Sequence, residues 1–219
     1  VVAGTSCGSV AVLLAAAALV RALPGEAQLS LLVPEVNTMG LALLGGRPLT
    51  DALGGGAAGE FEAAIVLEND LLRRAPAETA RAFAAGCPYV VLLDHIRTPS
   101  VELADAVLPV ATFAESTGTV VSHEGRAQRF FSVLEAVGEV RESWRWLQAV
   151  LAAAGRPEAA WDGVDDVTAA LVADQPELAA VLAVAPPAAW RDAGMKVPRQ
   201  SPRFSGRTAM HAAQQVAEP

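Results

Sequence analysis

Polar side chains that could bind a ligand or transfer a proton follow two apolar runs of the sequence. Glu68-Asn69-Asp70 come directly after the run 63–67, and Asp94-His95 come directly after the run 89–93. If both runs are parallel strands, these residues lie at the carboxyl end of a sheet, where open α/β folds bind their ligands. A plain turn uses the same residue types. For Glu68-Asn69-Asp70 the sequence alone therefore leaves binding and turn formation equally open.

Two histidines and two cysteines are the other candidates for chemistry. Asp94-His95 and His123-Glu124 could each supply a histidine and a carboxylate for acid–base work, but nothing in the sequence brings them together. A structural or solvated role is therefore favoured for each histidine. Cys7 and Cys87 lack metal-ligand spacing, and only Cys7 lies near an expected helix start that could activate a thiol. They cannot hold a Cys₄ cluster, and they indicate a reducing compartment.

The segment from Gly4 to Ser9 is a glycine-containing loop between an expected strand and an expected helix. Backbone N–H groups and the helix dipole could hold a phosphate there. The spacing matches neither dinucleotide nor nucleoside-triphosphate loops. A tight turn with Ser6 or Ser9 as the helix N-cap is the favoured interpretation. Nucleotide binding at this loop is the weaker alternative.

The elements that position these residues follow a β-α-β pattern. Five short apolar runs bounded by Gly, Pro, Asn or Asp read as buried strands, at 1–3, 28–33, 63–67, 89–93 and 106–110. Helical patterns at 9–23 and 76–85 separate them, and 48–53 reads as one helical turn between glycine-rich loops. Continuous apolar strands are typical of parallel sheets. The sequence predicts an α/β fold with a mainly parallel, doubly wound sheet.

The pattern changes after residue 110. Short strands are expected at 119–122 and 130–134, and helices at 143–154, 165–173 and 176–184. From 186 on, prolines and spaced arginines predict an extended tail. We therefore divide the chain into an α/β domain (1–134), a helical segment (135–185) and an extended basic tail (186–219).

Composition excludes several classes of protein. With 53% apolar and 18% charged residues, the 219-residue chain is typical of a folded domain rather than a disordered one. The longest apolar run has only eleven residues, Val10 to Val20, so membrane insertion is not expected. The net charge of −8 argues against nucleic-acid binding. Residues 186–219 carry +3 of net charge, which leaves −11 on residues 1–185. Because the chain opens on Val1-Val2 without Met, we expect it to be truncated at its N-terminus.

One long segment carries a family signature. It comprises Ala104–Pro109, Phe113–Thr119 and Glu124–Phe131: a strand ending in proline, a loop with a glutamate, a glycine turn and two arginines. This run resembles the signature of the molybdopterin oxidoreductase superfamily. Within that superfamily, the chain resembles the large iron–sulfur subunits of NADH:quinone oxidoreductases. Several separate segments support this resemblance, and they follow one another in the expected order: 37–41, 43–46, 66–71, 94–98, 142–147 and 204–210.

The resemblance implies candidate cofactor-binding positions but no catalytic residue. In molybdenum members, residues equivalent to Glu68-Asn69 and Thr98 help to hold a pterin nucleotide. A third position, expected to be Asn, is Ser122, which precedes the Glu-Gly-Arg stretch that contains Arg126. Ser122 therefore departs from the family's pattern at this position. The five residues are therefore expected to be remnants of a pterin site, without molybdopterin and without a metal.

The resemblance also implies a function and partners. The chain would be a scaffold without its own redox centre in the peripheral arm of the oxidoreductase complex, with the other peripheral-arm subunits as partners. The parent protein would carry 4Fe-4S and 2Fe-2S clusters upstream, and would lie at the cytoplasmic side of the bacterial inner membrane. The complex would pass electrons from NADH to quinone and translocate protons. The alternative is a molybdenum or tungsten oxidoreductase of the formate dehydrogenase type.

Overall fold

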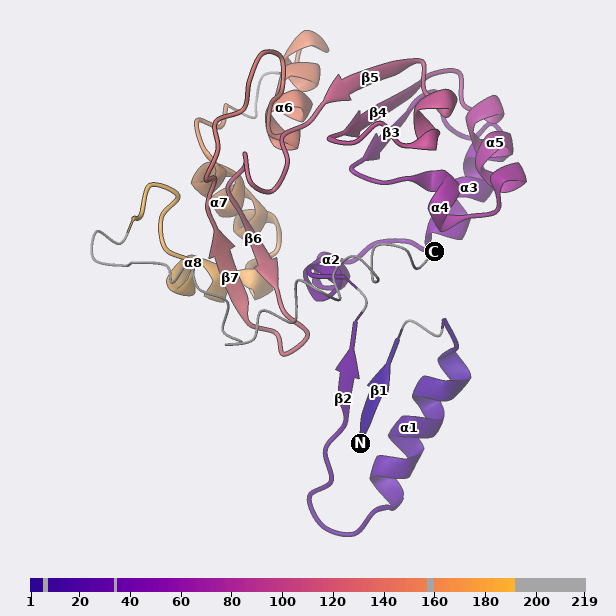
Figure 1. Cartoon of the computed structure of the whole chain (residues 1–219), viewed down its shortest axis with the longest axis vertical. Coiled ribbons are helices and arrows are strands. Elements are labelled where there is room, and N and C mark those ends of the chain that lie inside the picture. The colour runs from indigo at the N-terminus through magenta and orange to yellow at the C-terminus, as the bar shows by residue number, and fades with distance from the viewer. Residues whose placement is uncertain (6–7, 34, 157–159, 192–219) are drawn as a thin grey trace, which may run out of the picture. The chain divides into compact units, whose positions relative to one another are not determined.

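The structure, a computed structural model, describes residues 1–5, 8–33, 35–156 and 160–191 (Figure 1). The chain divides into two units, Val1–Ala188 and Ala189–Pro219, and the elements below belong to the first. Their order alternates strands and helices through β5, continues with a hairpin and ends with helices. The expected mixed α/β architecture with parallel sheets is therefore confirmed.

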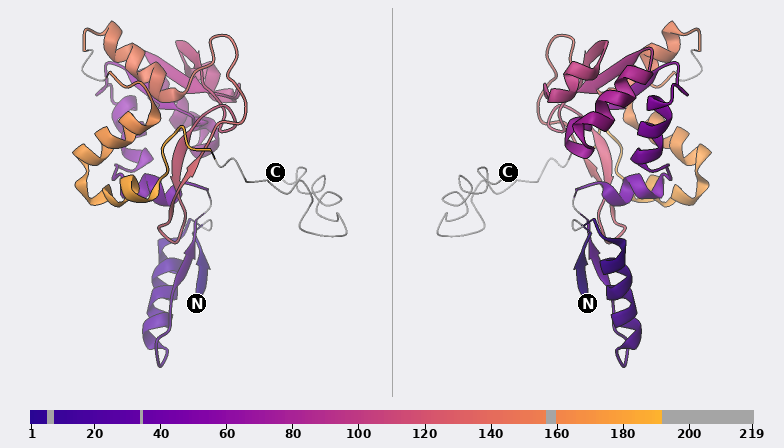
Figure 2. Two further views of the ribbon diagram at one scale, coloured as in Figure 1. Left: turned by 90° about the vertical axis from the view of Figure 1, so that its left-hand side faces the viewer. Right: turned by 90° about the vertical axis from the view of Figure 1, so that its right-hand side faces the viewer.

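A β-α-β unit opens the chain. Strands β1 (Val2–Gly4) and β2 (Ser30–Leu32) pair in parallel, and helix α1 (Val10–Ala22) connects them. The helix lies beside the strand pair in Figure 1 and in both views of Figure 2. Ser9 occupies the predicted N-cap position, although its side chain makes no capping hydrogen bond. None of the residues of α1 is buried.

The main core surrounds a three-stranded parallel sheet in the order β3-β4-β5, formed by Ala64–Leu67, Val90–Asp94 and Ala106–Pro109. The predicted strands thus form, but they pair in two sheets rather than one. The central strand is the most buried, with Leu92 and Leu93 almost inaccessible to solvent. This burial explains its continuous apolar sequence, because side chains on both faces of β4 are covered.

Two helices pack closely beside this sheet. Helix α3 runs from Leu49 to Ala57, and α5 from Ala77 to Gly86. The prediction of a single helical turn at 48–53 followed by a loop is wrong, because Gly54, Gly55 and Gly56 continue α3. The physical reason is close packing: a Cβ at Gly56 would overlap the Phe83 ring, and one at Gly86 would overlap the carbonyl oxygen of Gly56. The glycines are contact residues rather than loop residues.

Short elements complete the sheet connections and form a hairpin. Helix α4 (Leu71–Arg74) and the 3₁₀ helix η1 (Pro99–Leu103) flank the main sheet, and α2 (Thr38–Leu43) follows the first β-α-β unit. Strands β6 (Gly118–Val121) and β7 (Ala127–Phe130) pair in antiparallel fashion. The predicted strand at 130–134 is wrong, because the Ser122–Arg126 turn closes early and starts the return strand at Ala127.

The remaining helices are α6 (Ser143–Ala153), α7 (Val164–Asp174) and α8 (Ala180–Val184). Helix α6 contacts the end of β5 through Trp146, whose Nε1 donates to the Pro109 carbonyl at 2.7 Å. The predicted helix 176–184 is divided into the 3₁₀ helix η2 (Pro176–Leu178) and α8. The predicted extended tail lies outside the described residues from position 192 on.

Candidate functional site

The carboxyl end of β3 holds an unusual backbone conformation. Glu68 is the only non-glycine residue among those described whose φ is positive, at 47°, and its N–H donates to the Leu93 carbonyl at 2.7 Å. Non-glycine residues in this region are strained and are often found at functional sites. The Glu68 side chain is exposed. Glu68 directly follows β3 and thus lies at the carboxyl end of the sheet, as the sequence predicted.

The neighbouring polar side chains are engaged in structural contacts. Asn69 accepts a hydrogen bond from Arg74 Nε at 3.0 Å, and Arg74 also pairs with Glu35. Asp70 caps α4 by accepting from the Leu72 N–H at 3.1 Å and from the hydroxyl of Ser100. Capping by an aspartate stabilises a helix N-terminus by about 1 kcal/mol. The Glu68-Asn69-Asp70 segment therefore serves as a turn and helix start.

Thr98 lies between β4 and η1, near the same end of the sheet. Its Oγ1 is buried and has no hydrogen-bond partner in the described part of the chain. A buried hydroxyl without a partner costs about 1–3 kcal/mol. Of the five positions predicted from the resemblance, Thr98 is the one with a buried side-chain polar atom that has no partner in the described residues.

Ser122 and Arg126 belong to the turn of the β6–β7 hairpin. Ser122 Oγ accepts from the N–H groups of Glu124 and Arg126, each at 3.3 Å. The Arg126 guanidinium is 72% exposed and lies 3.9 Å from the Glu124 carboxylate. Within the described ranges, no hydrogen bond or ion pair joins this turn to Glu68, Asn69 or Thr98.

Two of these five side chains are already held by hydrogen bonds within the chain. The Asn69 amide oxygen is held by Arg74, and the Ser122 hydroxyl is held by its own turn. The Asn69 amide N–H₂ and the Ser122 O–H can still donate, so each side chain keeps part of its hydrogen-bonding capacity. Across the described residues, no three His, Cys, Asp or Glu side chains gather as metal ligands. That the five residues are remnants of a pterin site therefore stays a prediction.

The histidine and carboxylate pairs remain local. His95 Nδ1 lies 3.4 Å from Asp94 Oδ1, which also accepts the N–H groups of His95 and Ile96. Asp94 is thus occupied in shaping the turn after β4. His123 is exposed. The structure gives both histidines the turn and surface environments that the sequence favoured.

Glu115 is a better defined carboxylate that sequence reasoning did not select as a site. Its Oε2 accepts from the Thr112 N–H at 3.0 Å and from the Thr112 hydroxyl at 2.8 Å. These two bonds hold the pKa of the Glu115 carboxyl below its usual value, burial opposes them, and the charge of His95 adds a smaller lowering. The carboxylate stays ionised and organises the loop 112–117.

Cys87, the cysteine among the described residues, is not activated as a nucleophile. Cys87 is 5% exposed, and burial raises the pKa of its thiol, which keeps it protonated and unreactive. Cys7, with Ser6, lies outside the described residues. In the predicted Gly4–Ser9 loop, the described residues form a turn: the Gly8 N–H donates to the Thr5 carbonyl at 3.1 Å, and Gly8 has a φ of 63°.

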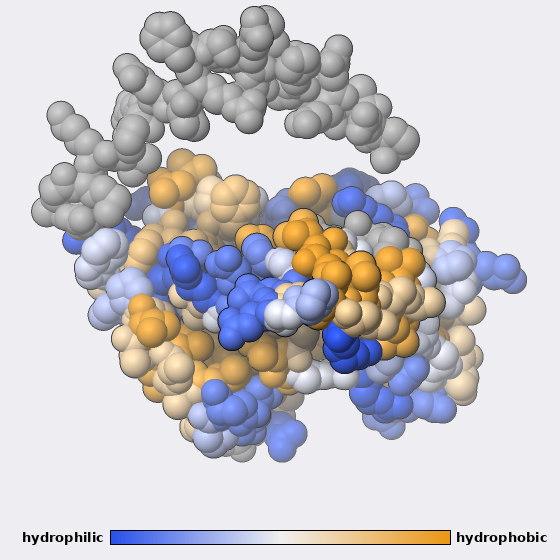
Figure 3. Space-filling model, turned by 90° about the horizontal axis from the view of Figure 1, so that it is seen from below, coloured by the Kyte–Doolittle hydropathy of each residue, from blue (hydrophilic) through white to orange (hydrophobic). Residues whose placement is uncertain are grey.

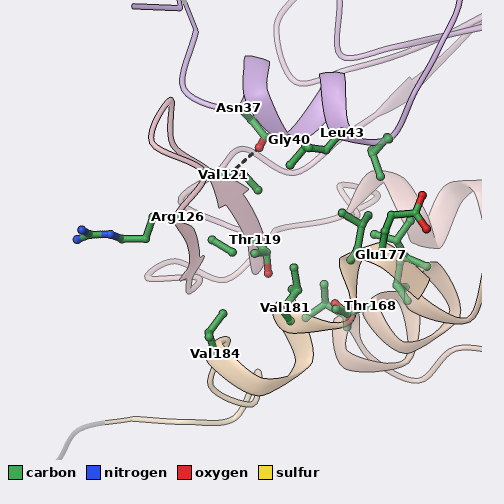
Figure 4. Close-up of a pocket in the computed structure, with 18 residues that line it drawn as sticks. Asn37, Gly40, Leu43, Thr119, Val121, Arg126, Thr168, Glu177, Val181 and Val184 are labelled. Atoms are coloured by element: carbon green, nitrogen blue, oxygen red, sulfur yellow. Dashed lines mark hydrogen bonds between the residues drawn. The ribbon is translucent and has the colours of Figure 1, made fainter. Parts of the chain in front are cut away.

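A cavity of about 570 Å³ lies between α2, the β6–β7 hairpin, α7, η2 and α8 (Figure 4). Its walls are mainly aliphatic, and Thr119, Val121 and Val181 are among the residues that line it. Figure 4 shows Arg126 extending away from the other labelled side chains. Sequence analysis missed this cavity, because its walls come from five separate elements whose packing no local pattern encodes.

Comparisons with known proteins define the family. A family model for molybdopterin oxidoreductases matches residues 6–153. Relatives include proteins named as the G subunit of NADH-quinone oxidoreductase, from Pseudomonas putida (44% identical), Pseudomonas fluorescens (43%) and Escherichia coli K12 (42%). Each alignment covers the whole of this chain but only 25% of the relative, so the chain spans about a quarter of those proteins. In the described residues, no helix has the length and apolar character needed to cross a membrane. The chain belongs to the molybdopterin oxidoreductase family.

Proposed function

We propose that this chain is a segment of the large iron–sulfur subunit of an NADH-quinone oxidoreductase and acts there as a scaffold without its own redox centre. The observation that carries the proposal is the alignment over the whole chain, at 42–44% identity, with proteins named as the G subunit of that enzyme. The complex would pass electrons from NADH through iron–sulfur clusters to quinone and couple this transfer to proton translocation. The 4Fe-4S and 2Fe-2S clusters would be bound by other parts of the parent polypeptide.

The site geometry supports the scaffold role. Asn69 is tied to Arg74, and Ser122 is tied to its own turn, so two predicted pterin-binding side chains already perform structural work. Glu68 and Thr98 lie at the carboxyl end of the main sheet, directly after β3 and at the start of η1. Such internal contacts are expected if the fold serves for structural support rather than for ligand binding.

The exposed apolar surface supports a place in a larger assembly. Helix α1 has no buried residue, and its Leu14 is 62% exposed. Apolar side chains gather over several parts of the face shown in Figure 3. Soluble monomers rarely leave large contiguous apolar patches uncovered. We assign the cover of α1 to the remaining polypeptide of the parent subunit, and the other peripheral-arm subunits are the partners of the assembled protein, at the cytoplasmic side of the inner membrane.

Substitutions on α1 test this placement. Leu14→Gln should leave the helix intact, because Gln is a good helix former and the residue is exposed. It should weaken docking of α1 by about 2 kcal/mol, roughly a factor of 30 in association. Arg21→Gln on the same helix is the matched control, with no expected effect on assembly. Assembly is measured on native gels of membranes that contain the full-length polypeptide.

The function itself is tested by complementation. In a respiring bacterium that lacks the gene for the full-length polypeptide, NADH-dependent quinone reduction by membranes should be lost, and the wild-type gene should restore it. Normal quinone reduction without the gene would refute the proposed function. Normal assembly of the Leu14→Gln variant would refute the placement of α1 without touching the function.

A further inference from the structure

We propose that the open edge of strand β3 pairs with an extended β-strand from a part of the parent polypeptide outside this chain. Within the described residues, β3 pairs with β4 on one side and with no strand on the other. An open edge presents unpaired N–H and C=O groups, to which another strand can bind. The inference rests on the proposed function, because it takes the partner strand from the parent subunit.

The hydrogen bonds of β3 identify the backbone groups that face the open edge. The N–H groups of Ala64 and Glu68 donate to carbonyl oxygens along the β4 segment, at 2.9 Å and 2.7 Å. In a parallel pair, every second residue of a strand directs its N–H and C=O groups to the same neighbour. The backbone groups of Ile65 and Leu67 therefore point away from β4. In the described part of the chain, no backbone hydrogen bond satisfies them.

The side chains of the same two residues are uncovered. Successive side chains of a strand point to opposite faces, and Val66 is buried in the core beside α3 and α5. Ile65 and Leu67 therefore lie on the other face, where they are 48% and 43% exposed. Leu93, the register partner of Leu67, is completely buried on that face. The face is thus covered over β4 and open over β3.

The chemistry of this edge favours a strand over other kinds of cover. Natural proteins often protect an exposed edge with charged residues or proline, and β3 contains only Ala-Ile-Val-Leu. Any apolar surface could cover the side chains, but the free backbone groups also need donors and acceptors at the spacing of a strand. On the far side of the sheet, Val110 directly after β5 forms a parallel bridge with Arg141. The β3 edge has no such bridge among the described residues.

The source of the strand follows from the length of the parent and the size of the edge. The chain spans 25% of the relatives that it matches, which leaves the larger part of such a parent to supply a strand. A strand in the same polypeptide binds at a high effective concentration. A second copy would have to associate through strands of four residues, whereas stable interfaces bury on the order of 1,200 Å² or more. The parent polypeptide is therefore the better source.

Hydrogen exchange at single amides tests the pairing in the purified complex that contains the full-length polypeptide. The Ala64 amide, which is bonded to the β4 segment, serves as the internal reference. Without a partner strand, the amides of Ile65 and Leu67 should exchange nearly as fast as in an unstructured peptide. With the proposed strand, both should exchange at least about a hundredfold more slowly than that. Faster exchange of either amide would overturn the proposal.

A proline variant separates strand pairing from burial alone. Ile65→Pro removes an N–H that faces the open edge, where proline is tolerated. It should speed the exchange of Leu67 at least about tenfold and leave that of Glu68, which is bonded to β4, unchanged. Ile65→Thr retains the N–H and the β-branched shape, so this matched control should keep Leu67 protected. Unchanged exchange of Leu67 in Ile65→Pro, or an equal loss of protection in Ile65→Thr, would contradict strand pairing. If Ile65→Pro does not fold, the wild-type exchange decides.

Two further readouts keep the source of the strand and the proposed function apart. Protection of Ile65 and Leu67 should persist in the full-length polypeptide purified without other subunits and shown by native mass spectrometry to be a single copy. Protection only in a larger assembly would assign the strand to another chain and overturn the proposal. NADH-dependent quinone reduction is measured on the purified complex. Its absence with protected amides would refute the proposed function alone, and normal reduction with unprotected amides would refute the strand alone.

Discussion

The close approach of α3 and α5 gives the most direct test of how this sequence specifies its core. A Cβ at Gly86 would overlap the Gly56 carbonyl oxygen and lie 3.0 Å from the Ala57 Cα. The obstructing atoms belong to the backbone, so a rotamer change cannot relieve the overlap and one helix must move. We predict that Gly86→Ala destabilises the protein although alanine is the better helix former.

The magnitude follows from two opposing terms. Replacing Gly by Ala inside a helix stabilises by about 0.5–1 kcal/mol. Overpacking a filled core costs about 1–3 kcal/mol, occasionally more. For Gly86→Ala the packing cost should win, with a net loss of about 1–2 kcal/mol. Gly54→Ala in α3 isolates the first term, because nothing lies within 4 Å of a Cβ there.

The assay is equilibrium unfolding in urea, followed by circular dichroism at constant pH. Gly54→Ala should raise the free energy of unfolding by about 0.5–1 kcal/mol, and Gly86→Ala should lower it. The pair shares one chemical change in two helices, so it separates propensity from packing. A Gly86→Ala protein as stable as Gly54→Ala would refute the close packing of α3 on α5.

Two further predictions concern titration. Because hydrogen bonds from Thr112 lower the pKa of Glu115 in the folded state, Glu115 stabilises the fold above its unfolded pKa of about 4.5. This stabilisation should disappear as the pH falls through the lower folded pKa. The urea midpoint of Glu115→Gln should therefore lack the part of the acid-dependent loss that Glu115 causes in the wild type. A variant whose midpoint depends on pH as the wild type's does would contradict the prediction. Burial raises the pKa of the Cys87 thiol. In a Cys7→Ser protein, where Cys87 is the remaining thiol, alkylation by iodoacetamide at pH ~8 should therefore be far slower in the folded protein than in urea. Equal rates would show that the thiol is accessible.

Local patterns predicted the strands of the fold well because burial and turn chemistry agree there. The runs that became β3, β4 and β5 are apolar and bounded by turn residues, and each strand lies within one or two residues of its predicted limits. Helix α1 likewise ends just before Pro24-Gly25. In these segments, local preference and tertiary environment favour the same structure.

The errors arose where tertiary contacts decide. Gly54, Gly55 and Gly56 read as a loop, yet the contact with α5 requires small residues in a continuous helix. Strand β7 begins at Ala127 because hydrogen bonds of the Ser122–Arg126 turn fix the register. The distribution of parallel strands over two sheets likewise depends on pairing between distant segments, which apolar patterning does not specify.

The candidate site was only partly accessible from the sequence. Position after a strand correctly placed Glu68 and Asn69 at the end of β3. The contact between Asn69 and Arg74 could not be anticipated, since it depends on the short helix α4. Nor could the pairing of Thr119 with Arg129, which requires the hairpin register. These contacts determine which side chains remain available to a ligand.

The metal content of the purified complex tests the central claim most directly. The full-length polypeptide is isolated with its partners from cells grown with molybdate and tungstate, and its metals are measured by mass spectrometry together with NADH-dependent quinone reduction. The scaffold account predicts iron and quinone reduction, with molybdenum and tungsten far below one atom per polypeptide. One molybdenum or tungsten atom per polypeptide would contradict it.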